Sequence, residues 1–446
     1  MSAKPVPAQS SGISYQELIA SDAVAPPDVL TLTSRFDSPL VSVPVSRYTT
    51  KAFHELEMEK LWPKVWQMAC REEHIPEVGD FHVYEIGSYS IIVVRTKEGI
   101  KAHHNVCRHR GRKLCDHHGH AASFICPFHG FSWNTDGSLR GVTSEWDFPQ
   151  IDKDDFDLNP VRAETWGGWV FINMDMDAEP LADFLGDLPA HFDVWQPENR
   201  YVEAHVAKVM PANWKLVQEA FMEAFHVITT HPQILEGSGD ENSQYDAWGN
   251  FSRAITPSGT HSPHLKTAPT EQEKLDAVFM KDLDSPSMVE VPEGATARSV
   301  IGALSRGNYE GVVGEGASLS DACLNDSIYY TLFPNFHPWG GYARIVYRFR
   351  PYKNHHDKSV MECFYLTPCK ADERPAPATM TWLNEDQDWT EAPQLGMLAK
   401  IFQQDSFNLP KVQEGLEAAQ FDEVVFANYQ ETKLRHFHQL LGKYLA

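Results

Sequence analysis

The alternation of hydrophobic and polar positions predicts a helix and then a small β domain in the first part of the chain. Residues 50–67 place apolar side chains at helical spacing until Pro63 interrupts the pattern. The apolar positions of that helix are Phe53, Leu56 and Leu61. Residues 81–106 carry three β-rich runs separated at glycines, and residues 166–175 have the composition of a closing strand. We therefore expect a β domain in this region.

The rest of the chain reads as a larger mixture of helices and strands. Residues 212–232 form one amphipathic helical pattern, and three β-rich runs follow at 327–333, 341–352 and 359–369. In the middle run Ile345, Tyr347 and Phe349 alternate with Arg344, Arg348 and Arg350. That alternation predicts a sheet with one face in solvent. Residues 236–326 are rich in Gly, Ser, Asp and Pro, which is typical of a long irregular insertion that serves as a lid or mobile loop.

Composition narrows the class of protein. The 446 residues are 42% hydrophobic and carry a formal charge of −23, which disfavours binding to nucleic acid or anionic lipid. Residues 1–45, rich in Ala, Pro, Ser and Thr, predict an extended arm. No apolar run approaches the ~18 residues of a membrane span. We expect a cytoplasmic protein, and an odd count of seven cysteines favours metal binding or catalysis over a disulfide framework.

One segment, CRHRGRKLCDHHGHAASFICPFHG, concentrates metal-binding side chains. Cys107-x-His109 and Cys126-x-x-His129 are separated by sixteen residues, and a glycine follows each pair. Cys₂His₂ is a standard set for structural zinc. Zinc sites usually pair like with like across a knuckle, however, whereas two loops with one Cys and one His each are the layout of a Rieske [2Fe–2S] centre.

The helix after Pro211 suggests a second metal site. Glu223 and His226 lie opposite its predicted apolar stripe, and His231 follows at i+5, about 140° away on a continuous helix. Pro232 disfavours helix at His231, so the helix can end there and His231 can turn back toward His226. Asp405 continues an apolar helical stripe, and a buried acid requires compensation such as a metal. The set matches the two-histidine, one-carboxylate triad of non-haem Fe(II).

These motifs resemble the catalytic α subunits of the Rieske non-haem iron oxygenases, the aromatic ring-hydroxylating dioxygenase family. CRHRG and CPFHGFSW match the oxygenase type of Rieske loop, with Arg112 and Phe128 where respiratory Rieske proteins carry disulfide cysteines. NWKLVQEAFMEAFHVITTHP and QQDSFNLPKVQEGL match the two catalytic segments. The resemblance implies an α+β fold: an N-terminal arm (1–45), a small all-β Rieske domain with its preceding helix (46–175), and a helix-grip, START-like catalytic domain with an antiparallel sheet (176–446).

The resemblance also implies roles for individual residues. Carried over by position, the [2Fe–2S] ligands are Cys107, His109, Cys126 and His129, and the ligands of the mononuclear iron are His226, His231 and Asp405. Glu223 takes the place of an acid, commonly aspartate, that bridges a cluster histidine of one subunit to an iron-ligating histidine of its neighbour. The expected partners are His129 and His226. Glutamate keeps the charge but adds a methylene group, which leaves the geometry of the bridge open.

The function that follows is O₂-dependent hydroxylation of an aromatic or other hydrophobic ring, as mono- or cis-dihydroxylation. Oxidative O- or N-demethylation is an alternative, and an electron carrier without catalysis is a second one. The chain has no G-x-G-x-x-G fingerprint, so electrons from NAD(P)H are expected through a separate reductase, with or without a ferredoxin. The family assembles as a head-to-tail trimer, so a homotrimer or an α₃β₃ complex is expected.

Overall fold

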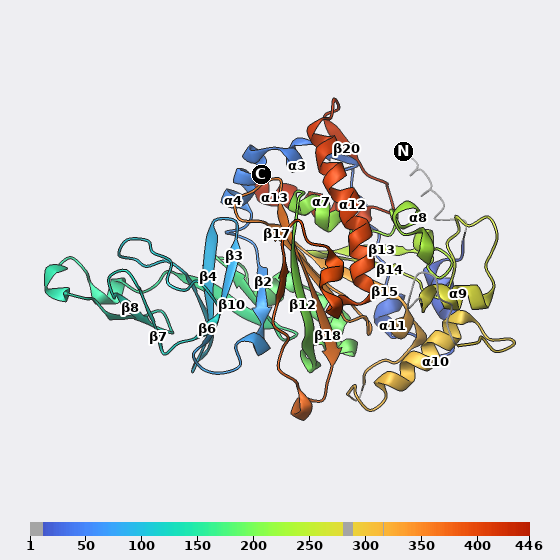
Figure 1. Ribbon diagram of the computed structural model, residues 1–446, viewed down its shortest axis with the longest axis horizontal. Coiled ribbons are helices and arrows are strands. Elements are labelled where there is room, and N and C mark those ends of the chain that lie inside the picture. Colours follow the sequence, from blue (N-terminus) through green and yellow to red (C-terminus); the bar gives the residue numbers. More distant parts are fainter. Residues whose placement is uncertain (1–11, 280–288, 315) are drawn as a thin grey trace.

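The computed structural model describes residues 12–279, 289–314 and 316–446. A narrow β-rich part projects from one side of a larger part in which helices cover a sheet (Figure 1). The α+β fold class is therefore confirmed, with antiparallel pairing dominant in both sheets. Among the described residues, no helix is both long and apolar enough to cross a membrane.

The β-rich part contains one seven-stranded sheet and one three-stranded sheet. The larger sheet has the order β2-β11-β10-β5-β4-β3-β6. Its strands are β2 (Gln67–Arg71), β3 (Asp80–Ile86), β4 (Tyr89–Thr96), β5 (Gly99–His104), β6 (Gly119–His120), β10 (Pro160–Trp166) and β11 (Trp169–Asn173). The smaller sheet, β7 (Ser123–Ile125), β8 (Ser132–Asn134) and β9 (Leu139–Gly141), extends toward the far end (Figure 1). The strands predicted in 81–106 and 166–175 are confirmed.

An eight-stranded sheet organises the larger part, in the order β13-β14-β15-β16-β17-β18-β12-β19. Only β19 is parallel to its neighbour. The strands are β12 (Arg200–Met210), β13 (Gln244–Trp248), β14 (Phe251–Thr256), β15 (Ser327–Leu332), β16 (Phe336–Pro338), β17 (Ile345–Pro351), β18 (Ser359–Pro368) and β19 (Thr381–Leu383). The three β-rich runs expected after residue 326 are thus confirmed as β15, β17 and β18.

Helices pack on one face of this sheet. They are α7 (Trp214–Glu219), α12 (Met397–Glu417) and α13 (Thr432–Leu445), which lie together over β17 and its neighbours in Figure 1. Phe221, just after α7, and Phe402 of α12 both contact Tyr347 of β17, with ring centroids 5.2 and 5.7 Å apart. The helix predicted from residue 50 up to the interruption at Pro63 is confirmed as α4 (Lys51–Lys60).

The opposite face of the sheet packs against the β-rich part, so the prediction that it lies in solvent is wrong. Arg348 is buried, donates to the carbonyls of Met68 and Ala69, and pairs with the buried carboxylate of Glu362. Trp169 of β11 packs on this face as well. The arginines of β17 occupy alternate positions because that face of the strand contacts the β-rich part rather than water.

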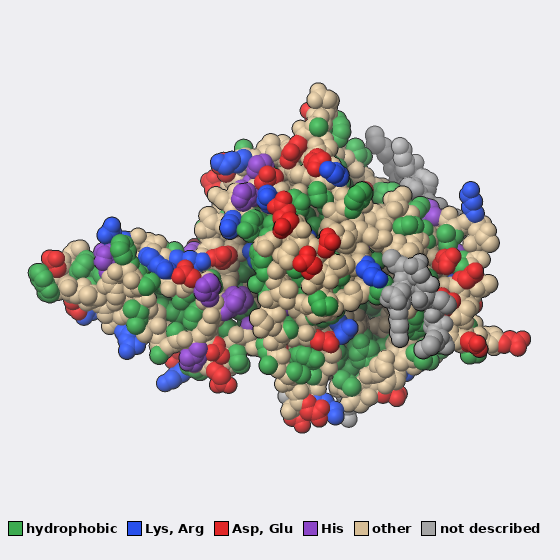
Figure 2. Space-filling model, viewed as in Figure 1, with side chains coloured by type: hydrophobic (Ala, Val, Ile, Leu, Met, Phe, Trp, Pro, Cys, Tyr) green, Lys and Arg blue, Asp and Glu red, His purple; other side chains and the backbone are tan. Residues whose placement is uncertain are grey.

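Histidines mark the junction between the two parts. A cavity of about 700 Å³ lies there, and Figure 2 shows histidine side chains in this region. His118 stacks on His82 with ring centroids 4.0 Å apart, and His74 stacks between His82 and His205. Imidazoles from both parts thus form a stacked series across the junction.

The N-terminal arm is not simply extended. Ser14 and Glu17 form a capping box that starts α1 (Tyr15–Ala20), and α2 (Asp28–Thr31) follows. The hydroxyl of Tyr15 donates to Asp326 at 3.0 Å, and Arg298 pairs with Asp22 and Asp326. The buried anchors of the arm are Tyr15, Ile19, Val29 and Leu30. Tertiary contacts therefore fix residues whose composition alone favours disorder; the prediction for residues 1–11 lies outside the described residues.

Residues 236–326 are also more regular than predicted. They supply the edge hairpin β13–β14 and three helices, α9 (Glu271–Val278), α10 (Ala297–Tyr309) and α11 (Asp321–Asn325). Residues 280–288 and 315 of this stretch lie outside the described residues. The remaining elements are α3 (Ser46–Thr49), α5 (Leu181–Leu185), α6 (Leu188–Phe192), α8 (Val227–Thr230) and a two-stranded sheet of β1 (Ser42–Pro44) and β20 (Glu423–Val425).

Candidate metal centres

Two loops of the β-rich part have the same backbone turn. In the loop after β5, Cys107 N–H donates to the carbonyl of Arg112, and Gly111 N–H donates to the carbonyl of Cys107. In the loop between β7 and β8, Cys126 N–H donates to Phe131 and Gly130 N–H donates to Cys126. Gly111 and Gly130 have φ angles of +74° and +75°, a backbone conformation that is unfavourable for residues with a Cβ atom.

These turns bring two thiols and two imidazoles together. Cys107 and Cys126 are each 2% exposed, and the rings of His109 and His129 are 4.7 Å apart. The Nδ1 atoms of both histidines are buried and have no hydrogen-bond partner in the described part of the chain. An unpartnered buried nitrogen is costly unless something binds it. The four side chains therefore fit a metal cluster held by two sulfur and two nitrogen atoms.

The environment of Cys107 also suits a thiolate ligand. Burial raises the pKa of the Cys107 thiol, while hydrogen bonds from the backbone N–H groups of His109 and Arg110 act to lower it. Amides directed at sulfur stabilise negative charge there. All seven cysteines are free thiols, as expected for a loop pair without the respiratory disulfide.

Aromatic rings surround the histidines. His109 stacks on Phe131 at 4.5 Å, and His129 lies against Phe128 at 3.9 Å. Phe128 is 56% exposed and Trp146, in the loop after β9, is 83% exposed. Large aromatic side chains in solvent are typical of surfaces that contact another protein.

A second group of ligand atoms gathers over the eight-stranded sheet. Each of His226, His231 and Asp405 offers an atom within 4.8 Å of the other two. Oδ1 of Asp405 lies 2.9 Å from Nε2 of His231 and 3.6 Å from Nε2 of His226. No other group of three or more His, Cys, Asp or Glu residues meets this criterion within residues 12–279, 289–314 and 316–446.

The local backbone explains how the two histidines meet. The predicted continuous helix over 212–230 is wrong, because α7 ends at Glu219 and α8 begins only at Val227. The predicted end before His231 is confirmed: this residue has φ −127° and ψ 51°, outside the helical region, and Pro232 follows. Phe225, placed on the apolar stripe by the continuous helix, is 45% exposed for the same reason.

Asp405 comes from a distant part of the sequence. It lies in the middle of the 21-residue helix α12 and is 5% exposed, as the apolar stripe predicted. Phe402, one turn earlier, packs against Phe221 and Tyr347. This packing holds the carboxylate against the two histidines, and it lines their surroundings with aromatic rings.

Hydrogen bonds at the Nδ1 atoms orient the imidazole rings of both histidines. Nδ1 of His226 lies 2.7 Å from Oε1 of Glu223, and Nδ1 of His231 lies 2.8 Å from Oε1 of Gln404. Gln233 donates to the same oxygen of Gln404. Burial alone lowers the pKa of His226, but the carboxylates of Glu223 and Asp405 outweigh it and raise that pKa. Both Nε2 atoms are left facing Asp405.

Sequence reasoning missed Gln404 as an orienting residue. Its position next to Asp405 is the only signal in the sequence, and the side chain reaches His231 because α12 lies beside the end of α8, where Asn408 donates to Thr230. It also missed a buried network in which Glu219 accepts hydrogen bonds from Tyr48 and lies 2.8 Å from Nε2 of His438. His103, which precedes the cluster loop in the sequence, is a buried residue of β5.

Fold and sites together define an iron–sulfur protein with a separate mononuclear metal site. The family description "Rieske [2Fe-2S] domain" matches residues 65–151, and "Ring hydroxylating alpha subunit (catalytic domain)" matches residues 196–446. The chain belongs to the family of ring-hydroxylating α subunits. Its cofactors are accordingly a Rieske [2Fe–2S] cluster and a mononuclear iron.

Named relatives have different substrates. The glycine betaine monooxygenase oxygenase subunit of Pseudomonas aeruginosa is 33% identical over 197 residues, which cover 44% of this chain and 46% of that protein. The biphenyl 2,3-dioxygenase α subunit of Rhodococcus jostii is 35% identical over 191 residues, 41% of this chain and 42% of that one. The chain spans about half the length of the curated relatives it matches.

Solved structures extend the likeness across both parts. One is the structure of a quaternary ammonium Rieske monooxygenase, described in connection with carnitine oxidation by gut microbiota. It superimposes with a TM-score of 0.65 at 17% sequence identity, and the match covers 93% of this chain and 100% of that chain. The structure of naphthalene 1,2-dioxygenase with indole bound superimposes with a TM-score of 0.63 at 18% sequence identity, and the match covers 91% of this chain and 92% of that chain. At such low identity these structures establish the fold alone.

Proposed function

We propose that this chain is the oxygenase component of a Rieske-type enzyme that hydroxylates an aromatic or other hydrophobic ring with O₂, as mono- or cis-dihydroxylation. The convergence of His226, His231 and Asp405 in a chain that also carries a Rieske domain is the observation that supports this most directly. An electron carrier has no need of the second site. We also propose the division into an arm (1–45), a Rieske domain (46–175) and a catalytic domain (176–446).

In this proposal Cys107, His109, Cys126 and His129 hold the cluster. The two buried cysteines and the two unpartnered Nδ1 atoms support that set. His226 and His231, through Nε2, and Asp405 hold the iron. Bound there, Fe(II) supplies open coordination positions at which O₂ is activated with electrons from outside.

Glu223 is proposed as a positioning residue. It accepts a hydrogen bond from Nδ1–H of His226 and so leaves Nε2 free for metal. The same carboxylate also accepts the backbone N–H of His226 at 3.0 Å, which fixes its orientation. We propose that Glu223 further connects His226 to His129 of a neighbouring subunit, in place of the aspartate common in the family.

The surface supports assembly and partners of that kind. Phe128 and Trp146 are exposed beside the cluster loops, and Phe225 and Phe407 are exposed on the segments that carry the iron ligands. A head-to-tail homotrimer, with or without a small β subunit, covers these apolar surfaces when one subunit's Rieske tip meets the next subunit's catalytic domain. Electrons then come from NAD(P)H through a reductase, with or without a ferredoxin, in the cytoplasm, where free cysteines persist.

Oxidative demethylation is the second candidate. The relatives named for glycine betaine and carnitine act on quaternary ammonium compounds, and aromatic rings such as Phe221, Tyr347 and Phe402 attract such cations as well as apolar rings. Oxygen uptake with biphenyl and with glycine betaine, each with product analysis, separates the two. Ring diols or phenols support the first candidate, and formaldehyde release supports the second.

Metal analysis tests the proposal before any substrate is known. We expect about three irons and two acid-labile sulfides per chain, with the low average g value of a histidine-ligated cluster after dithionite reduction. Two irons with two sulfides in fully loaded protein would make the chain an electron carrier. Zinc without sulfide would overturn the cluster assignment.

A further inference from the structure

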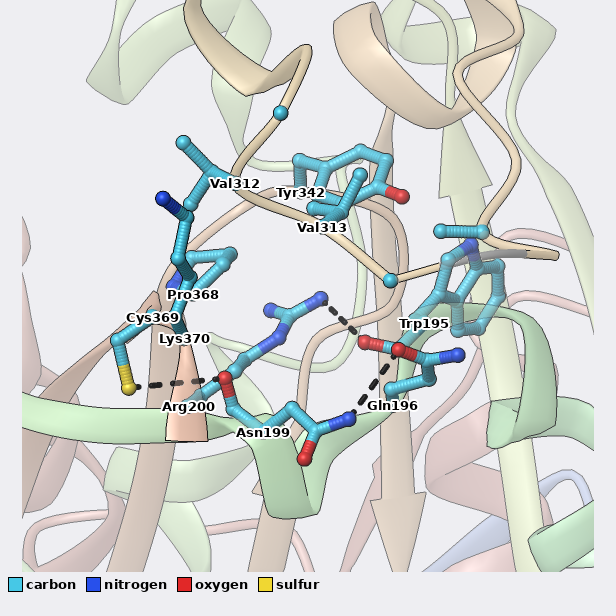
Figure 3. Close-up of a pocket in the computed structure, with 13 residues that line it drawn as sticks. Trp195, Gln196, Asn199, Arg200, Val312, Val313, Tyr342, Pro368, Cys369 and Lys370 are labelled. Carbon is cyan, nitrogen blue, oxygen red and sulfur yellow. Dashed lines mark hydrogen bonds between the residues drawn. The ribbon is translucent and has the colours of Figure 1, made fainter. Parts of the chain in front are cut away.

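A small cavity lies on the larger part of the molecule, at a place that none of the metal-site residues line. Its volume is about 280 Å³, and it is enclosed by the start of β12, the end of β18 and the loop after α10 (Figure 3). The residues that matter here are Trp195, Gln196, Arg200, Val313, Tyr342 and Lys370. Figure 3 shows the guanidinium of Arg200 beneath Tyr342 and Val313.

Arg200 is a buried cation that pairs with no carboxylate among the described residues. It is 3% exposed, and its Nη2 donates to the carbonyls of Gly341 at 2.7 Å and Trp195 at 3.1 Å. Nε is buried without an acceptor, Nη1 donates to none of the described residues, and no described carboxylate pairs with this side chain. Desolvation lowers the pKa of Arg200 to about 10, so the group remains charged at neutral pH.

Other buried arginines show how unusual this is. Arg71, Arg253, Arg298 and Arg348 each pair with a carboxylate. Arg435 has no carboxylate, but each of its nitrogens donates to a carbonyl. Arg200 has carbonyl acceptors at Nη2 alone and no carboxylate among the described residues, and a buried charge compensated only in part is costly unless a ligand completes it.

A second unsatisfied group lines the same cavity. The hydroxyl of Tyr342 is buried and has no partner among the described residues, and the ring centroid lies 5.8 Å from Cζ of Arg200. Burial raises the pKa of Tyr342 to about 12, so the phenol stays protonated and available as a donor. Gln196, also in the lining, has φ of +47°, a strained conformation for a residue with a side chain. Nε of the guanidinium and the phenol hydroxyl both lack acceptors among the described residues, which favours binding of an anion.

The walls indicate the kind of anion. Trp195, Val313 and the ring of Tyr342 are apolar surfaces, while the cation lies at the base. A carboxylate matches the planar fork of a guanidinium, and its apolar body suits such walls. We propose that this cavity binds a small organic carboxylate, with Arg200 on the carboxylate and Trp195 and Val313 on its body, at a site separate from the iron.

Benzoate is a suitable probe, and benzamide is its neutral counterpart of the same shape. By isothermal titration calorimetry of the metal-loaded protein we expect saturable binding of benzoate, and binding of benzamide at least about tenfold weaker because the charged hydrogen bond is lost. No benzoate binding tighter than about 10 mM, or equal binding of the two compounds, would overturn the proposal.

Variants locate the site. Arg200→Met should abolish benzoate binding, and Val313→Trp, which fills the cavity and leaves Arg200 in place, should weaken it at least about tenfold. Arg344→Met removes an exposed arginine nearby and serves as the matched control. Asp405→Ala should retain binding, because the iron site is not involved. If Arg200→Met does not fold, Val313→Trp tests the site instead. Unchanged benzoate binding in Val313→Trp would contradict the proposal, and so would loss of benzoate binding in Asp405→Ala.

Discussion

Nδ1 of His226 lies 2.7 Å from Oε1 of Glu223, only three residues earlier in the chain. Both residues lie in the segment between the end of α7 at Glu219 and the start of α8 at Val227. With its proton on Nδ1, His226 directs the lone pair of Nε2 toward Asp405. Glu223 thus orients the proposed metal ligand His226 through both its ring and its backbone N–H.

Replacing Glu223 tests this relationship. Glu223→Gln keeps an acceptor for the Nδ1 proton but removes the charge. We expect both metals to stay bound while turnover driven by NADH and a reductase falls by about 10- to 100-fold, because the residue no longer couples the two sites. Reduction of the cluster, followed by visible absorbance, should be unaffected. Glu223→Asp, which restores the family's usual acid, is the control, and normal turnover in Glu223→Gln would exclude the bridging role.

Replacing Asp405 tests the proposed iron site. Asp405→Ala should lower iron by about one atom per chain and leave sulfide and the visible absorbance of the cluster unchanged, because the remaining two histidines bind Fe(II) weakly. Metal analysis and absorbance spectra measure both. Asp386→Ala, at an exposed position in the preceding segment, should lose no iron. Full iron content and turnover in Asp405→Ala would remove this residue from the ligand set.

The junction between the two parts depends on Glu362. This carboxylate is fully buried and pairs with both Arg348 and Arg350. We expect Glu362→Gln to lower the free energy of unfolding by about 3 kcal/mol, since two guanidinium groups lose their counterion in a buried place. Chemical denaturation measures the change.

Glu203 supplies a matched control for that experiment. It pairs with Arg344 on the same sheet, but both side chains are about 40% exposed. Glu203→Gln should therefore cost less than about 1 kcal/mol. Equal effects of the two substitutions would show that Glu362 does not hold the junction.

Glu219 should make stability depend on pH. Burial raises the pKa of Glu219 to about 8, although Tyr48, Lys215 and Arg47 act to lower it. His438 and Glu431 also face this carboxyl. Between about pH 5 and pH 8 the unfolded chain releases the proton while the folded protein keeps it, so stability falls as pH rises, by up to about 1.4 kcal/mol per pH unit.

Glu219→Gln cannot ionise and should lose this dependence. Melting temperatures between about pH 5 and pH 8 should fall less steeply for the variant than for the unmodified protein. The exposed Glu59→Gln is the control, with a curve parallel to that of the unmodified protein. Parallel curves for Glu219→Gln as well would show that Glu219 is ionised in the folded state.

Local patterns predicted much of this protein. The spacing of Cys107, His109, Cys126 and His129, the breaks between β3, β4 and β5, and the end of the helix before His231 all depend on glycine, proline and nearest neighbours. Such features are set by steric limits on a few consecutive residues, so they can be read from the sequence.

Other features depend on partners far away in the chain. The alternating arginines of β17 suggested a face in water, and only the β sheet packed against them shows why Arg348 is buried. The arm at residues 12–45 is ordered by Asp326 and by the β13 edge, hundreds of residues later. The orientation of His231 by Gln404 likewise depends on the distant helix α12.

The sequence by itself determined which side chains can bind metal, because ligand chemistry belongs to residue type and short spacing. Tertiary structure alone decided which charges are compensated. Arg348 pairs with Glu362 and Asp405 lies against two histidines, whereas Arg200 donates to carbonyls and to no carboxylate of the described residues. The physical reason is that burial removes water from a charge, and what replaces the water is set by packing between distant segments.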